Sequence, residues 1–460
     1  MIAAPPAPTP SPSGQRVSLS LAEAIALGLR DNRTIRSAYL ERIAQKFDLT
    51  VTERRFVPRL DLAAQASIER RDGASIDHLS LTPTASWLSP TGGSLRFSWA
   101  RVTDRPDGGQ SVGAEVSALT LDQPLLRGAG LAVNLAPIRG ARLQEQINQL
   151  ALKATVSDAV TSIVLAYRTL IQSQAQVSLA EASLARTNDL LATNRALIQA
   201  GRMAAADIVQ AESGLANQQV ALLQAQQQQA SAQVALLRLL AVDQHTNIVA
   251  GDAIAVEHVD IDLDRVIALA LNNRMDVLAQ RKAVDQSRLA LMLAKNDRLW
   301  DVSVFASLEN RREIGPSSSA DLGDSRMAGV QVAIPLGDFS ARQAVIRSDT
   351  ALRTSELRLE DLQQGVEAQV RDTVQAVEST WRQLEAARRA RALSAQALEI
   401  AREKLKAGRA SNFEVLSMQA DLRAADIQDL TASVAYLNAL TLLDQQLGST
   451  LDTWRIALND

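Results

Sequence analysis

The chain has 460 residues, a formal net charge of -3, 21 glycines, 13 prolines and no cysteine. The balance of 48 basic and 51 acidic side chains excludes the bulk positive field that draws a protein to nucleic acid. The lack of cysteine excludes a disulfide framework, a thiolate metal site and a cysteine nucleophile. A composition dominated by Ala, Leu, Gln, Arg and Glu is typical of long helices.

Residues 1–17 are rich in proline and serine, and we expect them to form a flexible tail. They lack the basic segment and the long apolar segment of an intact signal peptide. Either the protein is not exported, or the start is processed or re-engineered. The chain has no run of 18 consecutive apolar residues, which argues against a transmembrane helix.

The first of two predicted repeats spans 18–260. Its first helix is capped by Ser18 or Ser20 and has Glu23 in its first turn, and its second helix stops at Pro58. The hydrophobic period then changes from 3.6 to 2, which predicts strands. The expected elements are helices at 21–32, 34–57, 137–200 and 204–241, strands within 59–122, and an equatorial connector at 242–260.

Four segments within 59–122 alternate apolar and polar side chains, as half-buried strands do. A turn at Pro90-Thr91-Gly92-Gly93 joins the second segment to the third. We expect the apolar face to consist of Leu60, Leu62, Ala64, Ala66, Ile68, Leu79, Leu81, Ala85, Trp87, Leu95, Phe97, Trp99, Val112, Ala114, Val116 and Ala118.

The second predicted repeat spans 261–447 and follows the same order, except that the hairpin 78–101 has no counterpart in it. Its expected elements are helices at 262–272, 275–299, 340–406 and 410–447, and strands within 301–335 around a polar loop at 315–324. A C-terminal equatorial segment, 448–460, completes the chain.

Matching residues support this duplication. Gly201 and Gly408 interrupt the helical pattern, and Asp207 and Glu414 follow them at the same offset. A repeat of more than 200 residues is far longer than the ~20–50 residues of solenoid repeats. The two halves are therefore expected to occupy equivalent places in a pseudo-symmetric structure.

The predicted helix lengths indicate an elongated coiled assembly. At about 1.5 Å per residue, the helix 137–200 is ~95 Å long, and the helices 34–57 and 204–241 together match it. Two strands per half are joined directly to helices, and four strands cannot close a barrel, so an oligomer must complete it. Seven of the 14 aromatics lie in or beside the strands, which fits interfacial girdles, with an ordinary sandwich core as the alternative: Phe56, Trp87, Phe97, Trp99, Trp300, Phe305 and Phe339.

No catalytic, cofactor or metal constellation stands out, so we expect a protein that is not an enzyme. The three histidines, His78, His245 and His258, form no spaced cluster with carboxylates. Three aspartates at 260, 262 and 264 imitate a calcium loop but lack its glycine and closing Glu, so we expect them to form a strand edge that leads into a helix N-cap.

Over nearly its whole length the chain resembles TolC-type outer-membrane efflux proteins. The resemblance rests on two similar openings, on the two tips with their trailing helices, and on a return from strand to long helix. These segments are Ser20-Leu21-Ala22-Glu23-Ala24-Ile25-Ala26-Leu27, Leu263-Asp264-Arg265-Val266-Ile267-Ala268-Leu269 and Gln123-Pro124-Leu125-Leu126-Arg127-Gly128.

The resemblance implies a fold that is mainly α with β. A long antiparallel coiled-coil α-helical barrel would lie in the periplasm, below a 12-stranded transmembrane β-barrel that is completed by trimerisation in the outer membrane of a Gram-negative cell. The implied partners are two further copies of the chain, a periplasmic adaptor (membrane fusion) protein, an inner-membrane pump and outer-membrane lipid. The implied function is the exit duct of a tripartite efflux or type I secretion system, a passive conduit gated at its helical tips.

The resemblance also implies roles for particular residues. The periplasmic gate would involve Glu414 and Asp207, while Ser417 occupies the family's second acidic position. The adaptor would dock at Gly201, Arg202, Gly408 and Arg409. The aromatics expected at the membrane interface are Trp87, Trp99, Trp300 and Phe305.

Two alternatives stay open at this point. We expect the hairpin 78–101 to be an extracellular extension, the alternative being that it adds strands to the barrel. A soluble coiled-coil scaffold with a small β domain is the alternative function. The exported substrate is not encoded in any pattern we identify.

Overall fold

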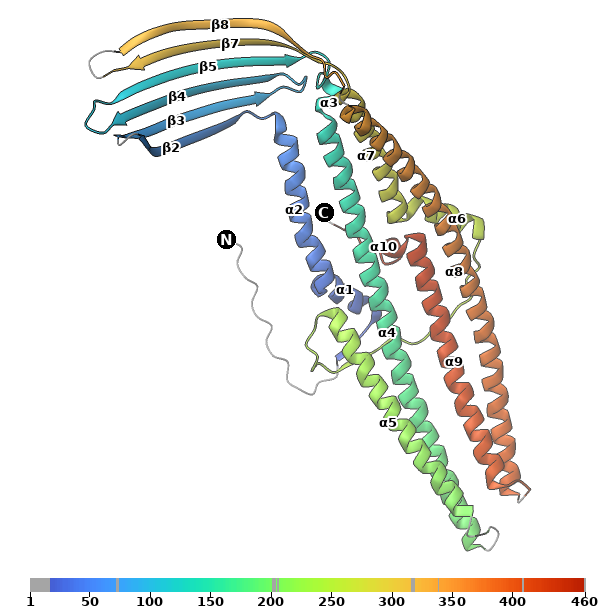
Figure 1. Ribbon diagram of the computed structural model, residues 1–460. Helices are drawn as coiled ribbons and strands as arrows, with labels where there is room; N and C mark the ends of the chain where they lie inside the picture. The colour runs from blue at the N-terminus through green and yellow to red at the C-terminus, as the bar shows by residue number, and fades with distance from the viewer. Residues whose placement is uncertain are drawn as a thin grey trace. The chain divides into compact units, whose positions relative to one another are not determined.

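The computed structural model describes residues 17–71, 74–200, 204, 207–315, 319–337, 339–407 and 409–458. The protein is mostly helical, at 65%, with β sheets (Figure 1). The helices within these residues are α1 (Leu21–Asp31), α2 (Arg33–Glu53), the 3-10 helix η1 (Arg54–Phe56), α3 (Leu131–Asn134), α4 (Ala136–Gln199), α5 (Asp207–Leu240), α6 (Leu263–Asn273), α7 (Met275–Asp297), α8 (Ser340–Lys406), α9 (Asn412–Leu447) and α10 (Thr450–Thr453). The strands are β1 (Val17–Leu19), β2 (Arg59–Arg71), β3 (Ala74–Leu88), β4 (Ser94–Pro106), β5 (Val112–Pro124), β6 (Ile248–Ala250), β7 (Asp301–Ile314) and β8 (Ser319–Ala333).

The helices come in matched pairs along the chain. Helices α1 and α6 have 11 residues each, α2 and α7 have 21 and 23, α4 and α8 have 64 and 67, and α5 and α9 have 34 and 36. The predicted helices therefore form with small shifts at their ends, and the helix predicted at 340–406 has the bounds of α8.

Two of the predicted caps are present. Ser20 caps α1 in a reciprocal arrangement, in which its hydroxyl accepts from Glu23 N and the Glu23 carboxylate accepts from Ser20 N. Asp262 caps α6 by accepting from the backbone of Asp264 and Arg265. The run of aspartates thus leads into a helix, as expected, but the expected strand edge is wrong, since residues 251–262 form no strand.

The chain forms two compact units, of which unit 1 comprises 1–41, 150–278 and 362–460. The middle of α4 provides its hydrophobic core, because Val156, Val160, Ile163 and Tyr167 are fully buried at a spacing of three to four residues. Side chains of α1 and α5 pack on this stripe. In the connector, β6 pairs in parallel with β1.

One helical stretch differs from the expectation about membrane-spanning helices. Leu131–Gln199 is long enough, and over an 18-residue window apolar enough, to cross a membrane by length and composition. Of that window, 44% is buried inside the protein. Because α4 contributes fully buried side chains to the core of unit 1, its apolar character has a structural explanation.

Unit 2 comprises 42–149 and 279–361 and contains a six-stranded antiparallel sheet in the order β2-β3-β4-β5-β7-β8 (Figure 1). The expectation that the hairpin 78–101 is an extension outside a four-stranded set is therefore wrong. Its two strands are β3 and β4, which pair with β2 and β5 inside the sheet.

The polar loop predicted at 315–324 is also largely wrong. Strand β7 continues to Ile314 and β8 begins at Ser319, with Glu313 paired to Ala320. A register shift between Arg311 and Arg312 faces the region of Gly323, whose φ is +99°. Pairing within the hairpin overrides the weak strand preference of Gly and Ser, since β propensity depends strongly on context.

Candidate functional site

The large sheet has two chemically different faces. Side chains of paired residues point to the same face, so the register joins Leu95 to Leu121, Phe97 to Leu119, and Leu119 to Leu308 on one apolar face. The large apolar side chains exposed on this face are Leu60, Leu62, Ile68, Leu79, Leu81, Trp87, Leu95, Phe97, Leu119, Leu121, Val304, Leu308, Val330 and Val332. A soluble protein seldom exposes an apolar area of this extent, so the face requires a partner or lipid.

On β4, β5 and β7 the apolar face ends at a charged row farther from the helices, whereas on β2 and β3 it continues past this row to Ile68 and Leu79. Arg101 pairs with Glu115 in the register, Glu115 pairs with Arg312, and the Arg101 and Glu115 side chains lie 3.5 Å apart. An apolar band followed by charges on the same strands is the pattern of a surface that leaves lipid for water.

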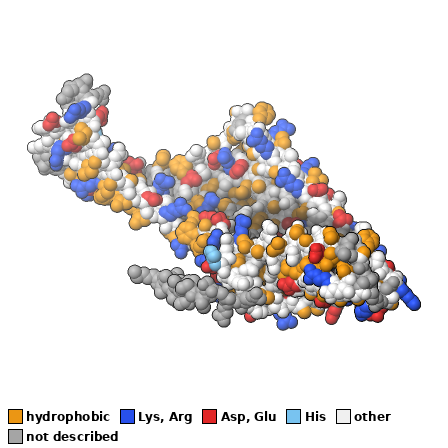
Figure 2. Space-filling model, turned by 90° about the horizontal axis from the view of Figure 1, so that it is seen from below, with side chains coloured by type: hydrophobic (Ala, Val, Ile, Leu, Met, Phe, Trp, Pro, Cys, Tyr) orange, Lys and Arg blue, Asp and Glu red, His pale blue; other side chains and the backbone are white. Residues whose placement is uncertain are grey.

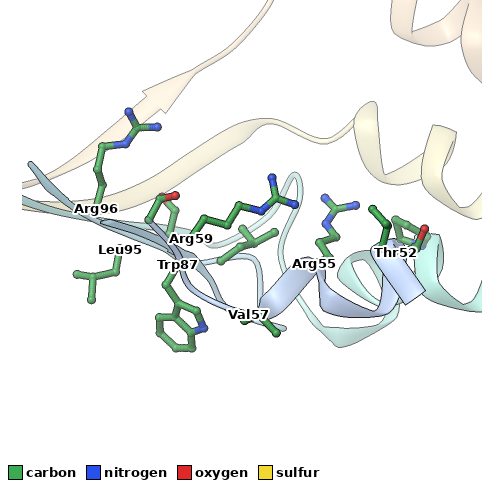
Figure 3. Close-up of a pocket in the computed structure, with 12 residues that line it drawn as sticks. Thr52, Arg55, Val57, Arg59, Trp87, Leu95 and Arg96 are labelled. Carbon is green, nitrogen blue, oxygen red and sulfur yellow. The ribbon is translucent and has the colours of Figure 1, made fainter. Parts of the chain in front are cut away.

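The opposite face is predominantly polar. Arg59 pairs with Ser86, which pairs with Arg96, which in turn pairs with Thr120, so these four side chains lie on this face. Figure 3 shows Arg59 and Arg96 leaving their strands on the side opposite to Trp87 and Leu95. These residues belong to a surface hollow of about 610 Å³ where η1 meets the first strands, and Arg55 also lines it.

The register corrects the expected apolar face at one strand. Val112, Ala114, Val116 and Ala118 lie on the polar face, because Ala118 pairs with Ser98 and with Glu309. The expected alternation is present in β5, but its small apolar residues lie on the polar face and Leu119 lies on the apolar face, so the expected assignment of the two faces is reversed in this strand. Only pairing with the neighbouring strands decides which set of positions faces outward.

The four aromatics predicted at the interface do not share one face. Trp87 and Trp99 lie on the apolar face, and the Trp87 indole donates to the carbonyl of Phe56 over 3.0 Å. Trp300 is exposed just before β7. Phe305 lies on the polar face, where its ring covers Gly329, so we remove it from the expected girdle.

In unit 1, one predicted gate residue lies at the start of α9. Ser411 caps this helix by accepting from Glu414 N over 3.2 Å, and this places the Glu414 carboxylate in the first turn. Ser417 lies one turn further and is half-buried. Both residues flank Val415, which belongs to a small core, the tip cluster, formed by Leu190, Leu398, Ala401, Leu405 and Val415.

The other predicted tip residues are only partly described. Arg409 is exposed between α8 and α9. Gly201, Arg202 and Gly408 lie outside the described residues, and of Asp207 only the backbone, as the first residue of α5, is described. The proposed roles of these residues are therefore argued from the sequence alone.

Sequence reasoning missed a cationic link between α8 and α9. The Arg391 guanidinium lies 2.8 Å from Asp426 and 3.4 Å from Asp429, and contact with these carboxylates raises its pKa. A signal was present, because α9 buries a polar residue at every seventh position: Asn412, Gln419, Asp426 and Ser433. Heptad-spaced polar positions fix the register of packed helices.

A second missed feature is a buried ion pair in unit 2. Arg42 of α2 is 3% exposed and pairs with Glu145 of α4.

On the face of the molecule shown in Figure 2, basic and acidic side chains are interspersed, in accord with the small net charge.

These features define a two-faced sheet whose strands continue directly into duplicated long helices. The protein-family model "Outer membrane efflux protein" matches residues 25–242 and 266–449, which form one stretch in each half of the chain. The chain belongs to the outer membrane efflux protein family. The two matched stretches also confirm the internal duplication.

The efflux protein has relatives at low sequence identity. BepC of Brucella suis biovar 1, an outer membrane efflux protein, is 25% identical over 338 residues, which are 70% of this chain and 71% of BepC. Solved structures with the same fold include the CmeC outer membrane channel of Campylobacter jejuni, with a TM-score of 0.70, 14% identity, and coverage of 94% of this chain and 86% of CmeC. VceC of Vibrio cholerae has a TM-score of 0.71 and 17% identity, with coverage of 93% of this chain and 96% of VceC. Open-state MtrE of Neisseria gonorrhoeae has a TM-score of 0.68 and 15% identity, with coverage of 94% of this chain and 89% of MtrE.

Membership of this family places the efflux protein in the outer membrane of a Gram-negative cell, as an exit duct for efflux. The alternative of a soluble coiled-coil scaffold is thereby set aside. Family members are channels rather than enzymes. Among the described residues, no group of three or more His, Asp or Glu side chains is arranged to hold a metal ion.

Proposed function

We propose that the efflux protein is the passive outer-membrane conduit of a tripartite efflux or type I secretion system, that it acts as a homotrimer, and that packing changes at its helical tips gate it. The observation that carries this proposal is the two-faced sheet, with one face apolar and exposed and the other polar. Such a wall separates lipid from water only when its two edges are closed, and further copies of the chain would close them.

Gating at the tips is supported by the packing around α9. The tip cluster joins Leu190 of α4 to Leu398 of α8 and Val415 of α9, and Glu414 lies beside it. Carboxylates gathered around a threefold axis would narrow the entrance and bind cations from the periplasm. A change in the packing of the coils would move Glu414 together with Val415.

Planar-bilayer conductance tests the gate. Replacing Glu414 and Asp207 by Ala should raise the leak conductance of the closed state, because two acidic groups that constrain the entrance are lost. The matched control is Glu360→Ala with Asp372→Ala, which removes two exposed carboxylates from α8 away from its tip. Equal conductance in the two double variants would refute the gate assignment.

The adaptor and the inner-membrane pump are the proposed partners at the periplasmic end. Arg409 is exposed between α8 and α9, and Arg202 occupies the corresponding position in the first half. Replacing both by Glu should abolish site-specific crosslinking to the adaptor, while Arg389→Glu on the exposed surface of α8 should preserve it. Crosslinking that survives the double replacement would assign docking to other residues.

A further inference from the structure

The β3–β4 hairpin spans the full length of the large sheet. At the end of the sheet where chain connections to helices occur, the helix-proximal end, Arg59 pairs with Ser86 and Ser94 pairs with Asp122. At the opposite end, Arg71 pairs with Ala74 and Asp104 with Val112. The hairpin therefore provides two complete wall strands.

The turn of this hairpin is held at the helix-proximal end. The backbone N–H of Gly130, just before α3, donates to the Thr91 carbonyl over 2.9 Å. Gly92 has a φ of +98°, and a Cβ at this position would lie 2.3 Å from the carbonyl oxygen of Gly128. Such close packing requires glycine, and it ties the turn to the start of the long helix. A hairpin that merely extended beyond the far end would make no contact here.

The two outer strands of the sheet are suited to pairing with each other in neighbouring copies. Strands β2 and β8 have 13 and 15 residues and no partner on their outer sides among the described strands. The six strands alternate in direction, so β2 and β8 run oppositely. A second copy placed edge to edge would therefore continue the antiparallel ladder.

We propose that three copies close one cylinder of 18 strands, six from each copy, in which β3 and β4 are lipid-facing wall strands. This inference rests on the proposed trimeric duct and changes its dimensions. With strands about 4.8 Å apart and tilted by about 40°, the backbone diameter is ~36 Å, whereas the four-stranded protomers expected from the sequence would give ~24 Å. The outer opening is thus about 1.5 times wider than a 12-stranded wall allows.

Thiol labelling in intact outer membranes tests the position of the hairpin, and the chain has no cysteine to interfere. Phe97 lies on the apolar face and its neighbour Ser98 on the polar face of β4. A membrane-impermeant maleimide should label Ser98→Cys and fail to label Phe97→Cys, and both should react after denaturation. Equal labelling of the two variants in a trimeric, outer-membrane protein would overturn the proposal.

Deletion of 74–106 provides a second measurement. It removes β3 and β4 and leaves β2 and β5 connected through 72–73 and 107–111 at the far end. Electron cryomicroscopy should show the cylinder diameter falling by about 1.5-fold, from 18 to 12 strands. An unchanged diameter would overturn the proposal. If the deletion variant does not fold, the labelling pair still decides it, and cell fractionation with mass analysis of the unmodified protein reports the trimeric outer-membrane duct separately.

Discussion

At the residue scale, Tyr167 joins three segments of unit 1. Its hydroxyl lies 2.8 Å from the carbonyl oxygen of Leu19 and 2.9 Å from Asp252 Oδ2, and the same carboxylate oxygen accepts from Leu21 N. One side chain of α4 thereby connects the strand before α1 and the connector after α5.

Replacement of Tyr167 by Phe should lower the free energy of unfolding by about 1–2 kcal/mol, because the folded state loses the hydrogen bonds of the buried hydroxyl to the Leu19 carbonyl and the Asp252 carboxylate. The control is Tyr39→Phe, a partly buried tyrosine that packs on the same core. Denaturant midpoints followed by circular dichroism measure both variants, and equal midpoints would show that the hydroxyl contributes nothing.

The same tyrosine predicts a pH dependence. Burial, and to a lesser extent the hydrogen bond with Asp252, raises the pKa of Tyr167 to about 12. The folded protein retains this proton between pH ~10 and ~12 while the unfolded chain releases it, so the stability contributed by Tyr167 is present below pH ~10 and is lost as pH rises through that window. The advantage of the wild type over Tyr167→Phe should therefore shrink between these values in denaturant titrations, and a constant advantage would contradict the assignment.

At the element scale, helix ends and helix pairs are controlled by single residues. Gly448 ends α9 with a φ of +69°, and its N–H donates to carbonyls of the last turn. A Cβ at Gly448 would lie 2.9 Å from the carbonyl oxygen of Asn273. This position therefore excludes side chains both by conformation and by contact with α6.

Gly448→Ala should destabilise unit 1 by about 1–2 kcal/mol or more, from the left-handed conformation alone. Gly365→Ala is the matched control, since Gly365 lies within α8 with open space around its Cα. That control should gain about 0.5–1 kcal/mol from helix propensity. Thermal unfolding should move the two variants in opposite directions, and a shift in the same direction would contradict the argument.

The pairing of α8 with α9 depends on Arg391. Asp426 is 8% exposed, so Arg391→Met would leave a buried carboxylate without its cation. Because solvent screens the half-exposed Arg391, we expect the free energy of unfolding to fall by only about 1–2 kcal/mol. Backbone hydrogen exchange near 391 and 426 should accelerate roughly 5- to 30-fold. Arg389→Met, which loses only a contact within its own helix turn, should leave the exchange rates unchanged.

At the scale of the whole molecule, each half of the duplicated chain repeats one order of elements, and the first half carries an additional hairpin. Among the strands that the structure describes, none pairs with the outer side of β2 or β8, so the sheet has two open edges. Purified protein in detergent should therefore contain three chains per particle by light scattering, because the exposed edges and the apolar face need partners. A stable monomer would contradict this expectation.

The sequence by itself determined the order and approximate ends of the helices and the internal duplication. Helix periodicity and capping are local, so the Ser20 cap, the Asp262 cap and the bounds of α8 followed from residues a few positions apart. The resemblance to the efflux family likewise followed from short motifs repeated in order. None of these inferences required knowledge of which distant segments meet.

Only the tertiary structure decided which strands belong to the sheet and on which face each side chain lies. The membership of β3 and β4, the polar-side position of Val116 and the placement of Phe305 against Gly329 all depend on pairing between segments distant in sequence. The same holds for Arg391 and Asp426, which are 35 residues apart. A period of two specifies that a strand has two faces, but the direction of each face is set by its neighbours, and so the sheet could not be predicted from local pattern alone.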